Sequence, residues 1–197
     1  IQVLSLESFG KLIQFHNKQI EPLLSELLPK LILLGNKDLY EKYFEEYKYL
    51  DKIKELNEFN ETTFELEEED NNDKLSTYAI PALSLSLIGS ISLHYPNILE
   101  NNIKSIIEGI QIQSKLPIQD SMCTTCKAMF LITKSIQLIP NYEKCLEFQE
   151  SIQIFIQICL NMIKTTNEIE VAGESFNVLG EIVRVFKVEI FSNKFEE

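Results

Sequence analysis

A proline-asparagine pair occurs twice in this chain, at Pro96-Asn97 and at Pro140-Asn141, forty-four residues apart. Each pair separates two segments whose apolar residues recur every three or four positions, which is the spacing of one face of an α-helix. A proline cannot continue a helix, so each pair marks a corner between two helices. The sequence therefore predicts a repeating unit of two antiparallel helices.

The repeat length points to a class of fold. Units of about 40 to 47 residues with two helices each are typical of HEAT and armadillo proteins. We therefore predict an all-α fold, a HEAT/armadillo-like α-solenoid. The approximate repeats are residues 1–36, 75–116, 118–165 and 167–197 (partial), with a helical extension and an acidic disordered loop at 37–73. Since the pattern starts in mid-helix and the last unit lacks its second helix, we expect a fragment of a longer chain.

Individual helices can be placed from their apolar stripes and end signals. We expect helices at residues 2–16, 20–34, 38–56, 75–95, 98–116, 120–139, 142–165 and from 167 onward. Pro81 would mark the start of its helix or a kink. Gly35-Asn36 would end the second helix as a left-handed C-cap, and Asn97 with Glu100 would form a capping box.

Three stripes are expected to face neighbouring helices, because an amphipathic helix turns its apolar face to the core. The first is Ile98, Leu99, Ile103, Ile106, Ile107 and Ile110; the second is Phe148, Ile152, Phe155, Ile156, Cys159 and Ile163; the third is Ile169, Ala172, Phe176, Leu179, Val183, Phe186 and Ile190.

Composition excludes several classes of function. The absence of tryptophan and the presence of only six glycines leave little for a turn-rich β fold. A net charge of −12 repels phosphate backbones and anionic lipids, so direct nucleic-acid binding and membrane-surface binding are excluded as the main activity. The apolar stretch at residues 80–93 is too short and too interrupted to insert in a bilayer. A basic or neutral protein partner is favoured.

The four cysteines, at positions 123, 126, 145 and 159, allow three interpretations. Cys123 and Cys126 have the two-residue gap of a zinc or redox pair, but both lie in a predicted helix. The favoured interpretation is that these cysteines are small buried residues. A zinc site is one alternative, and a redox pair, which needs a low-pKa thiol at an exposed helix N-terminus, is the other.

Catalytic motifs are lacking. The two histidines, His16 and His94, fall at predicted helix ends, where a donor near the last carbonyls is favourable. No glycine-rich phosphate loop, nucleophile elbow or zinc-protease motif occurs, and the acidic run lacks the alternating ligands of a calcium loop. We predict no catalytic, cofactor-binding or metal-binding residue, no cofactor and no enzymatic activity.

The negative charge is concentrated in one segment. Residues 41–73 contain thirteen acids and four lysines, which accounts for nine of the twelve net charges. This segment is either a passive surface loop or a polyanionic arm that attracts basic partners. The candidate partner-binding residues of this acidic arm are Glu65, Glu67, Glu68, Glu69, Asp70 and Asp73.

The order of segments resembles a known family. The chain runs from VLSLESFGKLI at residues 3–13, through a leucine-rich second helix and ELEEEDNND at 65–73, to YPNIL at 95–99. This layout is similar to the acidic-loop region of importin β (karyopherin β) transport receptors over residues 3–110. The resemblance implies a receptor of the cytoplasm and nucleus that wraps basic cargo, is regulated by the Ran GTPase and binds phenylalanine-glycine nucleoporins. The alternative is a HEAT-repeat scaffold subunit of a chromosome, ribosome-assembly or cytoskeletal complex.

Overall fold

The computed structural model describes residues 8–11, 13, 18, 21–36, 70–116 and 118–187, and every regular element in these ranges is helical. The 3₁₀ turns are η1 (Glu21–Leu23) and η2 (Tyr142–Lys144), and the α-helices are α2 (Leu24–Gly35), α4 (Asp70–Ser92), α5 (Ile98–Gln113), α6 (Gln119–Ile136), α7 (Leu146–Thr165) and α8 (Ile169–Phe186). The prediction of an all-α chain is confirmed for these residues.

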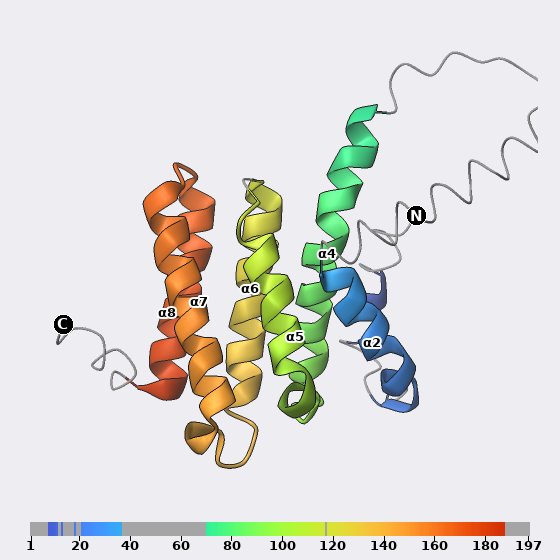
Figure 1. Ribbon diagram of the computed structural model, residues 1–197, viewed down its shortest axis with the longest axis vertical. Coiled ribbons are helices and arrows are strands. Elements are labelled where there is room, and N and C mark those ends of the chain that lie inside the picture. The colour runs from blue at the N-terminus through green and yellow to red at the C-terminus, as the bar shows by residue number, and fades with distance from the viewer. Residues whose placement is uncertain are drawn as a thin grey trace, which may run out of the picture.

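The helices are arranged in two layers (Figure 1). One layer contains α4, α6 and α8 side by side, with α6 between the other two. In the other layer α5 lies against α4 and α6, and α7 lies against α6 and α8. Helix α2 packs on α4 and α5. Sequential helices therefore alternate between the layers.

Helix α4 differs from its prediction. It begins at Asp70, five residues before the expected start, so residues 70–73 are helical and belong to no disordered loop. Pro81 is buried inside α4 and does not start it. The helix is able to begin earlier because acids in its first turn are favoured by the helix dipole. The predicted helix at 38–56 lies outside the described residues.

The two proline-asparagine corners are not equivalent. Asn97 has helical torsion angles (φ −60°, ψ −19°) and makes no side-chain capping bond, so the expected capping box with Glu100 is wrong. The backbone N–H groups of Leu99 and Glu100 instead donate to the carbonyls of Pro96 and Asn97, at 3.0 and 3.3 Å. The N–H groups that a side-chain cap would bond therefore already have acceptors. Asn141 at the second corner is left-handed, with φ 58°.

Gly35 is present for packing and not for a left-handed cap. No described glycine has a positive φ, and Asn36 is extended at φ −93° and ψ 106°, so the predicted C-cap is wrong. A Cβ at Gly35 would lie 2.9 Å from Cδ2 of Leu85, and a Cβ at Gly109 would lie 2.8 Å from the carbonyl oxygen of Gly35. The two glycines therefore let α2, α4 and α5 meet at van der Waals distance.

Small residues also bring α4 and α6 together. A Cβ at Gly89 would lie 2.9 Å from Cβ of Leu131 and 3.2 Å from the carbonyl oxygen of Ala128. The buried hydroxyl of Ser92 donates to Oγ of Ser135 at 2.7 Å, which joins the same two helices. The close contact between these helices follows from their short side chains.

The stripes of α5 and α7 face the core as predicted. Buried residues of the α5 stripe include Leu99, Ile103, Ile106, Ile107 and Ile110. Buried residues of the α7 stripe are Phe148, Ile152, Phe155 and Cys159, whereas Ile156 is partly buried against the same core.

The stripe expected to be the core face of α8 is only partly buried. Leu179 and Phe186 pack against the core, and Ile190 lies outside the described residues. Ile169, Phe176 and Val183 have exposed fractions of 89 %, 60 % and 39 %. The buried residues of α8 are Val171, Ser175, Val178, Glu181, Ile182 and Val185. The sequence carries apolar residues on more than one side of this helix, and packing against α6 and α7 buries the side that carries Val171, Val178 and Val185.

Candidate functional site: a polar groove between two helix corners

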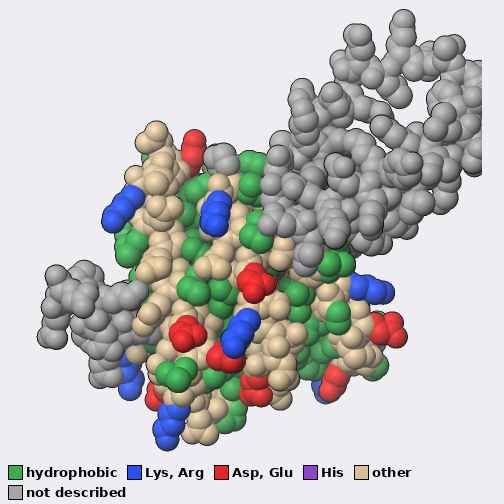
Figure 2. Space-filling model, viewed as in Figure 1, with side chains coloured by type: hydrophobic (Ala, Val, Ile, Leu, Met, Phe, Trp, Pro, Cys, Tyr) green, Lys and Arg blue, Asp and Glu red, His purple; other side chains and the backbone are tan. Residues whose placement is uncertain are grey.

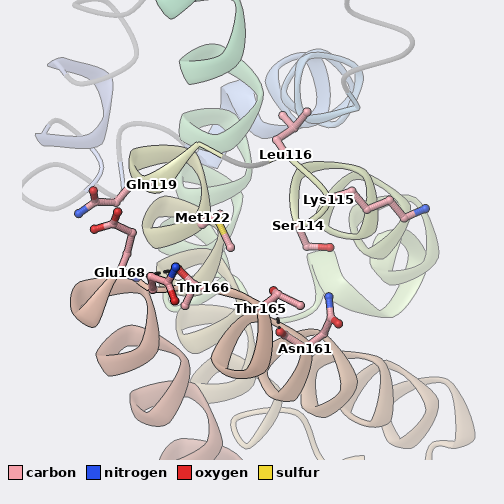
Figure 3. A pocket seen from close by; sticks show the side chains of 10 residues that line it. Ser114, Lys115, Leu116, Gln119, Met122, Asn161, Thr165, Thr166 and Glu168 are labelled. Atoms are coloured by element: carbon pink, nitrogen blue, oxygen red, sulfur yellow. Dashed lines mark hydrogen bonds between the residues drawn. The ribbon is translucent and has the colours of Figure 1, made fainter.

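A groove opens where the corner between α5 and α6 faces the corner between α7 and α8. Its volume is about 580 Å³, and it is lined by Ser114, Lys115, Leu116, Gln119, Met122, Asn161, Thr165, Thr166, Asn167 and Glu168. Ser114 and Asn161 point toward one another across the gap between α5 and α7, while Lys115 extends outward (Figure 3). We call this cavity and its extension, described next, the polar groove.

The groove continues along the layer of α5 and α7. A second hollow of about 210 Å³ shares Ser114, Lys115 and Asn161 with the first and adds Gln111, Gln157 and Ile158. On the face of the molecule that carries these helices, Lys and Arg side chains alternate with Asp and Glu among neutral side chains (Figure 2). The surface therefore offers an elongated neutral depression and no patch of a single charge.

Local hydrogen bonds fix the hydroxyl groups of the groove. Ser114 Oγ donates to the carbonyl of Gln111 at 2.9 Å, and Thr165 Oγ1 donates to that of Asn161 at 2.8 Å. Thr166 Oγ1 accepts from the backbone N–H of Glu168 at 3.0 Å, which holds the corner before α8. The three hydroxyl groups are therefore engaged within the chain, with carbonyls near the ends of α5 and α7 and with the start of α8.

The amide side chains of the groove are differently placed. Gln111, Gln157 and Asn161 have no side-chain hydrogen-bond partner within the described part of the chain. An amide carries two donors and an acceptor, so it can pair with both the N–H and the C=O of a peptide backbone. With one lysine and one glutamate at its edges, the groove suits a neutral, polar, extended ligand better than an ion.

Only two of the six residues predicted for the acidic arm are among the described residues. Asp70 and Asp73 lie in the first turn of α4, and Glu65, Glu67, Glu68 and Glu69 lie outside the described residues. The start of α4 is at the same end of the stack as the corner between α5 and α6 (Figure 1). The arm as a binding element remains a prediction.

The predicted location of His94 agrees with the structure. His94 is exposed, two residues beyond the end of α4, and its backbone N–H donates to the carbonyl of Ile91 at 3.0 Å. His16 lies outside the described residues.

The cysteines are core residues. Cys123, Cys126 and Cys159 are buried, which confirms the favoured interpretation, and Cys145 is half-buried. Cys126 Sγ lies 3.6 Å from Met162 Sδ, between α6 and α7. Among the described residues no three His, Cys, Asp or Glu side chains are grouped as metal ligands.

The redox-pair alternative is contradicted by the thiol environment. Burial raises the pKa of the Cys126 thiol to about 11, and it also raises the pKa of the thiols of Cys123 and Cys159. Thiol-disulfide exchange needs the thiolate, which a raised pKa disfavours. At neutral pH these thiols are therefore protonated.

Sequence reasoning missed the polar groove. A usable signal was present, since glutamine and asparagine recur near the ends of two second helices, at Gln111, Gln157 and Asn161. These residues predict a groove only when the fold is known, because the fold places the corner before α6 opposite the corner before α8.

Comparison with known proteins gave no relative: neither the family models nor the curated proteins nor the solved structures contain a match to this chain. In the described part of the chain, no helix combines the length and the hydropathy that crossing a bilayer requires.

Proposed function

We propose that this chain is a recognition segment of a HEAT-like α-solenoid, which binds an extended stretch of a partner protein in the polar groove. The observation that carries the proposal is the row of unpaired amides along α5 and α7, Gln111, Gln157 and Asn161. The alternation of helices between two layers supports the solenoid assignment, because stacked helix pairs place every second helix on one surface.

Backbone recognition makes a specific experimental prediction. A neutral, Ser/Gln-rich peptide of about ten residues is titrated against wild type, Gln157→Ala/Asn161→Ala and the control Asn101→Ala, an exposed amide elsewhere on α5. The double variant is expected to weaken binding by about thirtyfold, at roughly 1 kcal/mol for each of two lost hydrogen bonds, and the control to leave it unchanged. A peptide with N-methylated backbone nitrogens should bind wild type as weakly as it binds the double variant. Equal affinity of both peptides for wild type would contradict backbone recognition.

The narrower form of the proposal is a nuclear transport receptor of the importin β type, acting in the cytoplasm and nucleus without an enzymatic reaction. It is supported by the layout of residues 3–110 and by the acidic arm, which leads into α4 at the end of the stack where the groove opens. Binding to GTP-loaded Ran and to phenylalanine-glycine repeats tests this form, and failure to bind either would contradict it while leaving peptide recognition in place.

A scaffold subunit of a larger complex is the second candidate. One observation favours it: α8 carries a continuous apolar face that neither α6 nor α7 covers, with Ile169 89 % and Phe176 60 % exposed. A scaffold should copurify with a fixed set of subunits at constant stoichiometry, whereas a receptor should exchange its cargo.

A further inference from the structure

One buried amide beside the polar groove lacks a hydrogen-bond partner. Gln113, the last residue of α5, is 0 % exposed, and its Oε1 accepts from Oγ of Ser121 on α6 at 3.2 Å. Its Nε2, which carries two donors, has no acceptor within the described part of the chain. A buried donor without an acceptor costs free energy, so the position of this amide requires a physical explanation.

The amide lies next to residues that form the groove. Ser114 follows Gln113 in the chain, and the backbone N–H of Leu116 donates to the carbonyl of Gln113 at 3.1 Å. Ser121 directly precedes Met122 on α6. Ser114, Leu116 and Met122 all line the cavity (Figure 3). The hydrogen-bonded pair of Gln113 and Ser121 therefore lies behind the cavity wall.

Met122 is the part of that wall that can turn aside most easily. Its side chain is only partly buried, and its unbranched thioether has three rotatable bonds, which lets methionine adapt to different neighbours. Ser114, in contrast, is held by its hydrogen bond to the carbonyl of Gln111. Rotation of Met122 is therefore the least costly way for a ligand in the groove to reach the pair.

The pair offers one donor and one acceptor to such a ligand. Nε2 of Gln113 donates, and Oγ of Ser121, whose proton points to Oε1 of Gln113, accepts. A primary carboxamide has the complementary groups, a carbonyl oxygen and an NH₂ group, in one side chain. A carboxylate has no donor, and the helix starts around the groove already carry Asp120, Glu168 and Glu170. An aliphatic side chain would pair with neither atom.

We propose that the polar groove anchors its partner protein by a glutamine or asparagine side chain, which enters beside Met122 and bonds to Nε2 of Gln113 and Oγ of Ser121. The inference rests on the proposed function, because it assigns a side-chain preference to the extended segment whose backbone pairs with Gln157 and Asn161. Those two amides contribute affinity for any sequence. The buried pair adds selectivity, because a ligand without a carboxamide gains none of its hydrogen bonds.

The test compares peptides of about ten residues, rich in serine, that differ only in having Gln, Leu or Glu at one central position. Calorimetric titration of the 197-residue chain should show the Gln peptide binding about thirtyfold more tightly than the other two, the effect of two additional hydrogen bonds. The anchor variant, Gln113→Met/Ser121→Ala, should bind the Gln and Leu peptides alike. It should be at least as resistant to denaturant as wild type, because both polar partners are replaced by apolar groups of similar shape.

The matched control is Gln111→Met, which changes another glutamine on the same helix. This variant loses a contact with the peptide backbone, so it should bind the Gln and Leu peptides more weakly by the same factor and keep the preference for Gln. Magnetic resonance of the methionine methyl groups gives an independent readout. The methyl signal of Met122 should shift when the Gln peptide binds, and that of the fully buried Met129 should not.

The outcomes separate the anchor from the proposed function. If wild type binds all three peptides equally and Gln157→Ala/Asn161→Ala weakens each of them, backbone recognition stands and the carboxamide anchor is overturned. Equal affinity of wild type for the Gln and Glu peptides would also overturn it, as would a preference for Gln that survives in the anchor variant. Failure of every peptide to bind would overturn both the anchor and the proposed function.

Discussion

Glycine has opposite energetic roles at different positions of this chain, and the neighbouring atoms decide which one applies. At Gly109 a Cβ would contact backbone, the carbonyl of Gly35 at 2.8 Å, and backbone cannot rotate away as a side chain does. At Gly180 a Cβ would enter open space. Identical substitutions should therefore change stability in opposite directions.

We predict that Gly109→Ala lowers the free energy of unfolding by about 1 to 3 kcal/mol, as overpacking in a core does. In contrast, Gly180→Ala should raise it by about 0.5 to 1 kcal/mol, because alanine is the better helix residue. Urea denaturation at a concentration where the protein is monomeric measures both. Equal stability of the two variants would contradict the close contact between Gly109 on α5 and Gly35 on α2.

Glu181 links stability to pH. Its carboxylate, buried to 8 % exposure, accepts from Nε of Arg184 at 2.8 Å, and Arg184 Nη2 donates to Oε1 of Gln137 on the C-terminal side of α6 at 3.0 Å. The hydrogen bond from Arg184 is the main cause that holds the pKa of Glu181 below its ordinary value of 4.5, against the opposing effect of burial. The pair therefore joins α8 to the end of α6 as long as the carboxyl is ionised.

A carboxyl whose pKa is lowered by folding contributes stability above its unfolded pKa and loses it as pH falls through the folded pKa. We predict that Glu181→Gln costs about 1 kcal/mol at pH 7. This difference from wild type should begin to shrink as pH falls below the ordinary pKa of 4.5 and should be lost once pH passes the lower pKa of the folded protein. Thermal unfolding of both proteins from pH 7 to pH 3 measures it. A constant difference across that range would mean that ionisation of Glu181 is not involved.

At the scale of elements, one position on α7 separates the core from its margin. Phe155 is fully buried at 0 %, whereas Ile156 next to it is only partly buried. We predict that Phe155→Ala lowers the free energy of unfolding by about 3 to 5 kcal/mol and that Ile156→Ala lowers it by less than about 2 kcal/mol. Chemical denaturation of both variants measures this. A larger loss of stability for Ile156→Ala than for Phe155→Ala would contradict the assignment of Phe155 to the core face of α7.

Periodicity predicted elements better than it predicted their orientation. The stripe of α5 has one apolar side, so its buried face followed from the sequence. Helix α8 has apolar residues on more than one side, and part of its predicted stripe, Ile169, Phe176 and Val183, is exposed. The sequence contains no information on which side receives neighbours until α6 and α7 are placed.

Helix ends and the groove depended on tertiary contacts in the same way. The expected left-handed cap at Gly35 is absent because this glycine serves close packing against Leu85. The expected capping box at Asn97 is absent because the amide of Leu99 already donates to the carbonyl of Pro96. The polar groove needs the corners before α6 and α8 to face each other, which residue spacing within each repeat does not specify. Short-range patterns thus predicted the helices, and long-range packing determined the surface.

At the scale of the whole molecule, the charge distribution makes the acidic arm a testable binding element. Since Asp70 and Asp73 lie in the first turn of α4, where acids stabilise the helix dipole, a clean test leaves both in place. Neutralising Glu65, Glu67, Glu68 and Glu69 to Gln then removes four charges without altering that helix start.

We predict that this fourfold variant unfolds at the same denaturant concentration as wild type but binds a Lys/Arg-rich peptide more weakly, with a smaller loss of affinity on adding salt. The physical reason is that screening shortens from about 8 Å at physiological ionic strength to about 3 Å at 1 M, so only the wild-type arm has attraction left to lose. Calorimetric titration at two salt concentrations measures this. The control of equal charge neutralises Glu108, Glu143, Glu150 and Glu174 together, none of which lies in the first turn of an α-helix. The two variants carry the same total charge and differ only in where four negative charges were removed. Equal affinity of both variants for the peptide at both salt concentrations would therefore mean that the attraction arises from net charge alone and that the arm is a passive loop.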